Sequence, residues 1–137
     1  MAFIESDSAR ALLLRATRTI AVVGLSDKPG RDSYRVARYL QAQGYTIIPV
    51  NPTVESVLDQ RSYPDLASIG KPVDMVNVFR RPEFMPAIVE AAIAARARAV
   101  WMQFDTAHAG AAAVAASAGL DVVIDRCIMV EHRRRCA

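Results

Sequence analysis

The feature that most constrains the fold is a regular alternation of short apolar runs with segments of helical period. Five runs rich in β-branched residues occupy residues 19–25, 45–50, 73–79, 99–104 and 121–125. Runs of this length and composition predict strands that are buried on both faces. Since strands that alternate with helices are joined by parallel crossovers, the pattern predicts a doubly wound α/β sheet.

Helix start and stop signals lie between these runs. Helices are expected over residues 9–16, 33–43, 82–97 and 108–118, with a short helix over 64–70. The run Ser6-Asp7-Ser8 is placed to cap the first helix and Pro82 to open the third, while glycines follow the second and fourth. A short edge strand is expected near residues 61–63 and a short tail after residue 125. Nothing resembles a linker or a repeat, so a single domain is expected over residues 1–137.

The composition is typical of a folded domain rather than of a membrane or secreted protein. Hydrophobic residues make up 53% of the 137 residues and charged residues 23%. No apolar run approaches the roughly 20 residues that a membrane helix needs, and the first residues are acidic and polar, unlike a signal peptide. Cys127 and Cys136 form neither a disulfide framework nor a zinc pattern. We therefore expect a cytoplasmic protein without a metal site.

The net charge of +3 favours an anionic small molecule over a nucleic acid. A nucleic-acid surface needs a basic stripe with aromatic residues, and the only basic run is the short HRRR at residues 132–135. Most of the arginines are expected to lie on a solvated surface. A few of them near a cleft would suit an anionic ligand.

The segments that follow the strands are the candidate binding site, because ligands of open α/β sheets bind beyond the carboxyl ends of the strands. The turn after the first strand contains Gly24, Ser26, Lys28, Arg31 and Ser33. It has about eight residues between strand and helix, longer than the roughly 2–6 residues that are usual. Glycine, hydroxyls and positive charge at a helix N-terminus suit a phosphate. A plain surface loop with solvated charges is the alternative.

Two marks of an NAD site are missing. The first turn lacks the GxGxxG pattern, and the second strand ends in PVNPT without an acidic residue for the ribose hydroxyls. Both absences disfavour NAD, and the neutral Asn51–Pro52 end leaves room for a nucleotide that carries a ribose phosphate. An NAD(P)-binding oxidoreductase or redox sensor remains the alternative function.

The later strand ends add binding residues but no catalytic set. Phe79, Arg80 and Arg81 follow the third strand, and either Arg80 or Arg81 is placed to reach a phosphate, the alternative being that both are solvated. Gln103 follows the fourth strand, and Asp105 or Thr106 is expected to cap the next helix. Arg126 and Cys127 close the last strand, where the thiol is either buried and inert or reactive beside the arginine. No nucleophile is paired with a base by spacing, so we do not expect an enzyme.

Together the strand ends resemble those of the CoA-binding domain family, in particular its small stand-alone bacterial and archaeal members. More distantly they are similar to the N-terminal domain of the succinyl-CoA synthetase α subunit. The matching segments are IAVVGLSDKPGRDSYRVARYL, GYTIIPVNP, VDMVNVFRRPE, AVWMQFDT and AGLDVVIDRCIMVEH. The resemblance implies a Rossmann-like fold, with a mostly parallel sheet of five or six strands and helices on both faces. It also implies a non-catalytic module that holds coenzyme A or an acyl-CoA as a ligand.

The resemblance also implies which residues contact the ligand. They are Gly24, Leu25, Ser26, Lys28, Arg31, Ser33, Tyr34, Asn51, Pro52, Phe79, Arg80, Gln103, Phe104, Arg126 and Cys127. Many stand-alone members have a lysine directly after the Asn-Pro pair, where this chain has Thr53. A mixed disulfide between Cys127 and CoA is a further hypothesis. The expected partner is CoA or an acyl-CoA, with no nucleic acid and no membrane.

Overall fold

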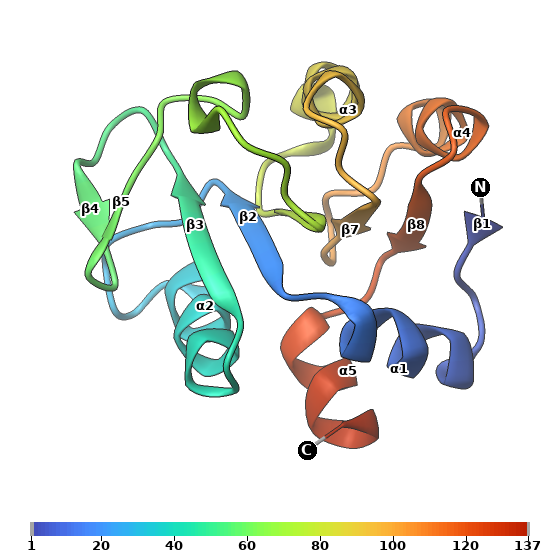
Figure 1. The fold of residues 1–137 in the computed structure, drawn as a ribbon, viewed down its shortest axis with the longest axis horizontal. Helices are drawn as coiled ribbons and strands as arrows, with labels where there is room; N and C mark the ends of the chain where they lie inside the picture. Colours follow the sequence, from blue (N-terminus) through green and yellow to red (C-terminus); the bar gives the residue numbers. More distant parts are fainter. Residues whose placement is uncertain (1, 137) are drawn as a thin grey trace.

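A parallel sheet of six strands forms the centre of the protein (Figure 1). The computed structural model describes residues 2–136. The strand order is β1-β8-β7-β6-β2-β3, and every pair of neighbours is parallel. The strands are β1 (Ala2–Phe3), β2 (Thr19–Val23), β3 (Thr46–Val50), β6 (Met75–Val78), β7 (Ala99–Met102) and β8 (Asp121–Ile124).

Helices cover both faces of this sheet, as the alternation of strands and helices predicts. Figure 1 shows α3 and α4 on one face and α1, α2 and α5 on the other. Their bounds are α1 (Asp7–Ala16), α2 (Asp32–Ala42), α3 (Met85–Ala94), α4 (Ala109–Ser117) and α5 (Ile128–Arg135), with 3-10 turns η1 (Ala67–Ile69) and η2 (Pro82–Phe84). The predicted Rossmann-like, doubly wound fold is confirmed.

Two apolar clusters, one on each face, form the core. Successive side chains of a strand point to opposite faces, so Met75 packs with the α1, α2 and α5 side and Val76 with the α3 and α4 side. Trp101 is fully buried on the first side. The central strands are therefore apolar at nearly every position, which explains why the sequence shows continuous runs instead of alternation.

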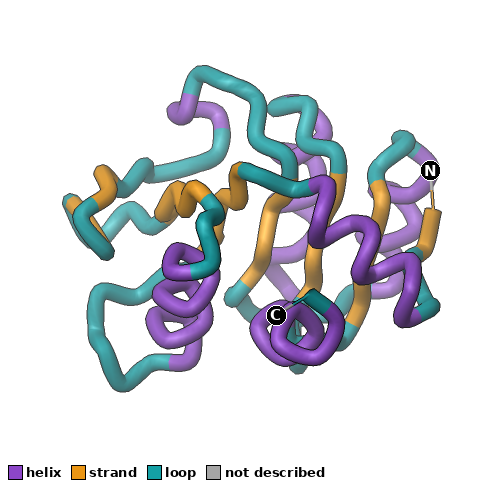
Figure 2. The backbone as a smooth tube through the Cα atoms, turned by 60° about the horizontal axis from the view of Figure 1, so that its bottom comes forward, coloured by secondary structure: helices purple, strands orange, loops and turns teal. Residues whose placement is uncertain are grey.

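The structure differs from the sequence prediction at the end of the chain. Residues 128–135, expected to be a short tail, form the helix α5. The strongly charged sequence IMVEHRRR hides a buried face of Ile128, Glu131 and His132, which recur at helical spacing. Figure 2 shows this helix in front of the strands, beside α1.

Three smaller differences concern pairing and capping. Strand β1 was not predicted, since two residues are too few to show a pattern. The predicted edge strand near residues 61–63 is confirmed in part: Tyr63 forms a parallel bridge with Val50, while β5 (Gln60–Arg61) pairs in a hairpin with β4 (Ser56–Val57). The cap of α4 is His108, whose Nδ1 accepts a hydrogen bond from the Ala111 N–H at 3.0 Å, and not Asp105 or Thr106. The predicted cap of α1 is confirmed, because Ser6 Oγ accepts from the Ala9 N–H.

The strand order determines where a ligand can enter. From β2 the chain moves outward to β3 and then returns to β6 on the other side of β2. The connections that leave β2 and β6 therefore run in opposite directions and open a crevice at the carboxyl ends of these two strands. The segment after β2 and the segment after β6 meet there. Within residues 2–136, no helix has both the length and the apolar character that crossing a bilayer requires.

Candidate functional site

Gly24 is the closest point of contact between the carboxyl ends of β2, β3 and β6. Its N–H donates to the Val50 carbonyl at 2.9 Å, and the Phe79 N–H donates to the Val23 carbonyl at 2.8 Å. The φ angle of Gly24 is 87°, and a Cβ there would lie 2.8 Å from the Phe79 carbonyl oxygen. Only glycine fits this turn without strain or collision.

Two serine hydroxyls hold the loop that follows. The Ser26 N–H donates to Ser33 Oγ at 3.0 Å, and the Lys28 N–H donates to Ser26 Oγ at 3.0 Å. Ser33 is buried, and so is Leu25. Each serine keeps its own proton for a further hydrogen bond. The two hydroxyls that the sequence marked as ligand donors thus also shape the loop.

The loop leads into an uncapped helix end. Arg31 is the N-cap of α2, and its side chain accepts no backbone N–H. Free amide groups and the positive end of the helix dipole are the usual means by which such a turn binds an anion. The N–H groups of Gly24, Ser26, Lys28 and Arg31 are already bonded within the protein, so the free N–H groups at the crevice are those of the first turn of α2.

Asn51 fastens β3 to this loop. Its Nδ2 donates to the Leu25 carbonyl at 3.0 Å. Its Oδ1 accepts from the Thr53 N–H at 2.9 Å and from Thr53 Oγ at 2.8 Å. Both ends of the amide are occupied, so the role that the geometry shows for Asn51 is to hold the ends of β2 and β3 together. Pro52 is exposed beside it.

Two hollows flank the crevice. The first, here the α2–α5 hollow, has a volume of about 270 Å³, and its lining includes Val36, Phe79, Gln103, Phe104, Cys127 and Met129. The second, here the α3 hollow, has a volume of about 240 Å³, and its lining includes Val50, Asp65, Leu66, Arg80, Phe84 and Ile88. Consecutive residues Phe79 and Arg80 line different hollows, so the segment after β6 lies between them.

Unpaired positive charge is concentrated at the crevice. Lys28 and Arg31 are exposed and Arg80 is half-buried. No carboxylate of residues 2–136 forms an ion pair with any of these three side chains. The Arg80 guanidinium lies 4.2 Å from the centroid of the Phe84 ring, which holds it in place by a cation–π contact. These charges are free to bind an anionic ligand.

The α3 hollow also contains a carboxylate. Ser68 donates hydrogen bonds to Asp65 Oδ1 from its hydroxyl at 2.6 Å and from its N–H at 2.9 Å. These bonds hold the pKa of Asp65 below its ordinary value, so the group is ionised at neutral pH. A negative charge there suits a hydrogen-bond donor and disfavours a phosphate.

Gln103 is buried behind the α2–α5 hollow and joins β7 to α5. Its Oε1 accepts from Asn77 Nδ2 and from the Ile128 N–H, both at 3.0 Å. Trp101 Nε1 donates to the Arg126 carbonyl at 2.8 Å. These bonds fix the start of α5, where Cys127 is the N-cap and is half-buried. The last predicted strand end is therefore rigidly connected to the site.

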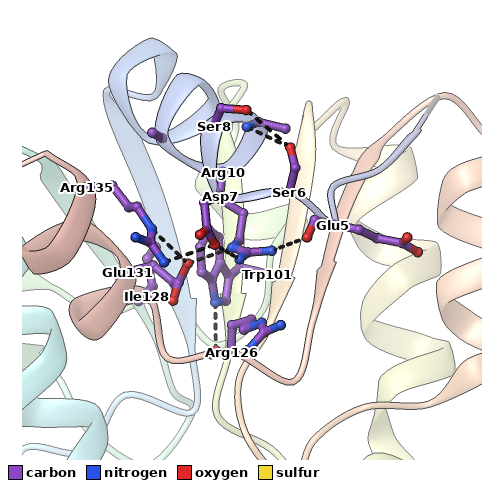
Figure 3. A network of polar contacts seen from close by, with 12 residues as sticks. Glu5, Ser6, Asp7, Ser8, Arg10, Trp101, Arg126, Ile128, Glu131 and Arg135 are labelled. Atoms are coloured by element: carbon purple, nitrogen blue, oxygen red, sulfur yellow. Dashed lines mark hydrogen bonds and ion pairs between the residues drawn. The ribbon is translucent and has the colours of Figure 1, made fainter.

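Not all of the predicted residues come together. The side chain of Arg126 lines a different hollow of about 300 Å³, with Ile4, Glu5 and Arg10. Figure 3 shows it below Trp101, near the ion-pair network of Arg10. Tyr34 is half-buried and packs against the core cluster of α2. Whether either residue contacts the ligand stays a prediction.

Sequence reasoning missed several lining residues. Asp32 and Arg35 line the α2–α5 hollow and form an ion pair with each other. Met129 lies in the same hollow, and Phe84 lines the α3 hollow. The sequence did contain a signal for Asp32 and Arg35, because positions 32, 35 and 36 lie on one face of the predicted helix. Within residues 2–136, no group of three or more His, Cys, Asp or Glu side chains is arranged to hold a metal ion.

Comparison with known proteins identifies the family. The sequence pattern of the CoA binding domain matches residues 18–133. The chain belongs to the CoA-binding domain family. This CoA-binding domain is 40% identical over 120 residues to the uncharacterized protein YneT of Bacillus subtilis, covering 88% of this chain and 89% of YneT.

Solved structures agree with that assignment. A hypothetical protein from Pyrococcus horikoshii is 38% identical, with a TM-score of 0.94 over 97% of this CoA-binding domain and 94% of that chain. The cell-free ID.343 protein from Thermus thermophilus is 35% identical, with a TM-score of 0.90 over 95% of this domain and 98% of that chain. The family resemblance predicted from the strand ends is confirmed over nearly the whole chain.

Proposed function

We propose that this domain binds coenzyme A or an acyl-CoA as a stand-alone, non-catalytic module. The observation that carries the proposal is the crevice between β2 and β6. An uncapped helix end and unpaired positive charge lie there together, between two hollows of different character. CoA has the matching parts, a charged diphosphate between a flat adenosine and a long, weakly polar arm.

The diphosphate lies at the free N–H groups of the first turn of α2. Gly24 has no Cβ and so lets the segment after β6 come close to this turn, and Lys28 and Arg31 are exposed in the loop between them. Arg80 reaches the same place from the segment after β6, because its Cδ lies 3.0 Å from the Cβ position of Gly24. Charge-assisted hydrogen bonds from these groups hold the phosphates.

The two hollows take the two ends of the ligand. The α3 hollow is lined by Leu66, Phe84 and Ile88 and has the Asp65 carboxylate at its side. It suits the adenine ring of CoA, whose amino group donates a hydrogen bond, with the ribose 3′-phosphate directed away from Asp65. The α2–α5 hollow, with Phe79 and Phe104, suits the pantetheine arm. Phe104 is 55% exposed, and an arm lying over its ring would cover this apolar surface.

The positions of both histidines support the non-catalytic part of the proposal, because each is engaged elsewhere. His108 accepts the N–H of Ala111 as the cap of α4. His132 is buried in the middle of α5, with its Nδ1 2.8 Å from Tyr39 Oη. Neither is placed as a general base at the crevice. The ligand would come from the cytoplasmic CoA pool.

Isothermal titration calorimetry with CoA, acetyl-CoA and a longer acyl-CoA tests the proposal. We expect binding of at least one of them that is clearly tighter than millimolar. If none binds more tightly than about 1 mM, which is roughly −4 kcal/mol, the proposal is wrong. Titration with NADPH, followed by nicotinamide fluorescence, is the control; binding of NADPH in place of CoA supports the oxidoreductase alternative.

A further inference from the structure

We infer that Cys127 captures the thiol end of the ligand as a mixed disulfide by exchange with CoA disulfide. The inference rests on the proposed function, because the arm of CoA must reach the α2–α5 hollow. Cys127 is half-buried at the start of α5 and lines that hollow with Phe79, Phe104 and Met129. Its side chain caps no backbone N–H of α5, so the sulfur is not engaged in holding the helix.

Gln103 is a second, independent indication that the hollow takes a ligand. Its side chain is 95% buried, since only 5% of the residue is exposed. Oε1 is held from behind by Asn77 and the Ile128 N–H. Nε2 donates to no atom of residues 2–136, and Gln103 lines the same hollow as Cys127. Nε2 is not one of the fully enclosed unpaired atoms of the structure, so it is open to the hollow, and the amide carbonyls of a pantetheine arm would accept its hydrogen bond beside the sulfur.

Cys127 has no partner thiol within the described part of the chain. The other cysteine of residues 2–136 is Cys136, at the opposite end of the eight-residue helix α5. Eight residues of helix span roughly 12 Å, whereas a disulfide needs Cα atoms within about 7 Å. Cys136 Sγ instead lies 3.8 Å from the Ala11 carbonyl oxygen, under α1. Cys136 is therefore too far away to compete with a ligand thiol for Cys127.

The chemistry is a thiol–disulfide exchange that needs no further oxidant. The Cys127 thiolate attacks one sulfur of CoA disulfide, so a Cys127–CoA bond forms as the ligand's S–S bond breaks. The second CoA leaves as a thiolate and takes up the proton that Cys127 released. The protein thiol is oxidised and one half of the ligand disulfide is reduced. A small thiol such as glutathione reverses the step.

Intact-mass spectrometry under non-reducing conditions tests the inference with two disulfides. The wild type, Cys127→Ser and Cys136→Ser are each treated with CoA disulfide and, separately, with hydroxyethyl disulfide, which has no nucleotide. We expect the wild type and Cys136→Ser to gain one CoA less two hydrogen atoms, and Cys127→Ser to gain none. Because bound phosphates raise the local concentration of the disulfide, CoA disulfide should react at Cys127 at least about tenfold faster than hydroxyethyl disulfide.

Equal rates with the two disulfides, or an adduct that maps to Cys136, would overturn the inference. Calorimetry of the reduced wild type with reduced CoA separates it from the proposed function. If reduced CoA binds but Cys127 shows no preference for CoA disulfide, the inference is wrong and the binding proposal stands. If reduced CoA does not bind, both are wrong. Thermal unfolding of both serine variants followed by circular dichroism verifies that they are folded.

Discussion

At the scale of single residues, Gly24 is the position that tolerates least change. We expect Gly24→Ala to lower the free energy of unfolding by about 1–3 kcal/mol, because alanine is strained at positive φ. The added Cβ also lies 2.8 Å from the backbone oxygen of Phe79, so the strand ends must separate. Urea unfolding measures the loss of stability. We also expect weaker CoA binding, because the strand ends move apart, and calorimetry with CoA measures it.

Gly30 provides the matched control in the same loop. A Cβ there meets no atom within 4 Å, and its φ is not positive. Gly30→Ala should therefore leave both stability and CoA affinity close to wild type. Equal losses in the two variants would show that the effect at Gly24 comes from loop flexibility and not from close packing of the strand ends.

Arg31 and Arg80 are expected to bind the phosphates. Arg31→Ala and Arg80→Ala should each raise the Kd for CoA by tenfold or more, since a hydrogen bond to a charged group is worth about 1.5–3 kcal/mol. Calorimetry at low and high salt checks this. Arg81→Ala is the control, because Arg81 is exposed and lies 3.8 Å from Glu83. Wild-type affinity in both test variants would place the phosphates elsewhere.

Thr53 stands where many relatives have a lysine, and its surroundings permit the exchange. The hydrogen bond from the Thr53 N–H to Asn51 does not depend on the side chain, and Thr53 is exposed. Thr53→Lys should tighten CoA binding by about 1 kcal/mol at low salt, with the gain lost at high salt through screening. Thr53→Gln controls for side-chain length. If both variants bind alike, charge at this position is not used.

At the scale of elements, the docking of α5 depends on a buried ion pair. Arg10 and Glu131 are each only 4% exposed, and Arg10 Nε donates to Glu131 Oε1 at 2.6 Å (Figure 3). Arg10 also donates to Asp7 Oδ1 and to the Glu5 carbonyl. The network joins the start of the chain to its last helix, and through α5 it holds Cys127 at the site.

Removing one partner of this pair should be destabilising. Glu131→Ala leaves the buried Arg10 Nε without its partner while Asp7 and the Glu5 carbonyl still hold the other nitrogens, and we expect a loss of about 1–3 kcal/mol in the free energy of unfolding, measured with urea. Glu90→Ala, on the exposed side of α3, is a control for loss of a helical glutamate. The double variant Arg10→Met with Glu131→Leu should recover part of the loss. If it is no more stable than Glu131→Ala, the unpaired Arg10 Nε is not the cause.

His132 makes the same docking sensitive to acid. It lies edge-on between the rings of Tyr39 and Tyr45, and burial lowers its pKa from the ordinary value of 6.5. The unfolded chain therefore binds a proton at a higher pH than the folded protein. The contribution of neutral His132 to the free energy of unfolding is therefore fully present above the unfolded-state pKa of about 6.5. It decreases as the pH falls from there to the lower pKa of the folded protein. Burial raises the pKa of Tyr45 to about 12, so this ring stays neutral.

The variant His132→Gln tests this dependence. Its unfolding free energy should change less between pH 7.5 and pH 5.5 than that of the wild type, because no group at this position takes up a proton. Lower stability at neutral pH is expected from the lost Tyr39 contact and does not bear on the test. An equal pH dependence in both proteins would assign the acid sensitivity to another group.

At the scale of the whole molecule, the strand order brings distant segments to one crevice. Gly24 and Phe79 are 55 positions apart, yet Gly24 is in contact range of the Phe79 backbone because β2 and β6 are neighbours. The same order separates Phe79 and Arg80 into two hollows. A ligand with a charged middle and two different ends therefore matches the arrangement better than a single compact metabolite.

Most strands and helices could be predicted from the sequence, because the interactions that form them act between residues close together in the chain. Apolar runs of strand length and helical-period segments identified the layers, and Gly24, Phe79 and Gln103 were placed at the carboxyl edge by position alone. The sequence did not reveal α5, since the three apolar residues of IMVEHRRR all stand at its start and the rest of the segment is charged or polar. It also could not show that Asn51 is a fastening residue, or that Arg126 lines another hollow.

By itself, then, the sequence determined the layers, the parallel connections and the edge at which a ligand binds. It did so because hydrophobic period and turn chemistry act over a few residues. Only the tertiary structure decided which strand ends are neighbours, how the crevice divides into two hollows, and that Cys127 lies in one of them beside Gln103. Those features depend on contacts between residues far apart in the chain, which no local pattern encodes.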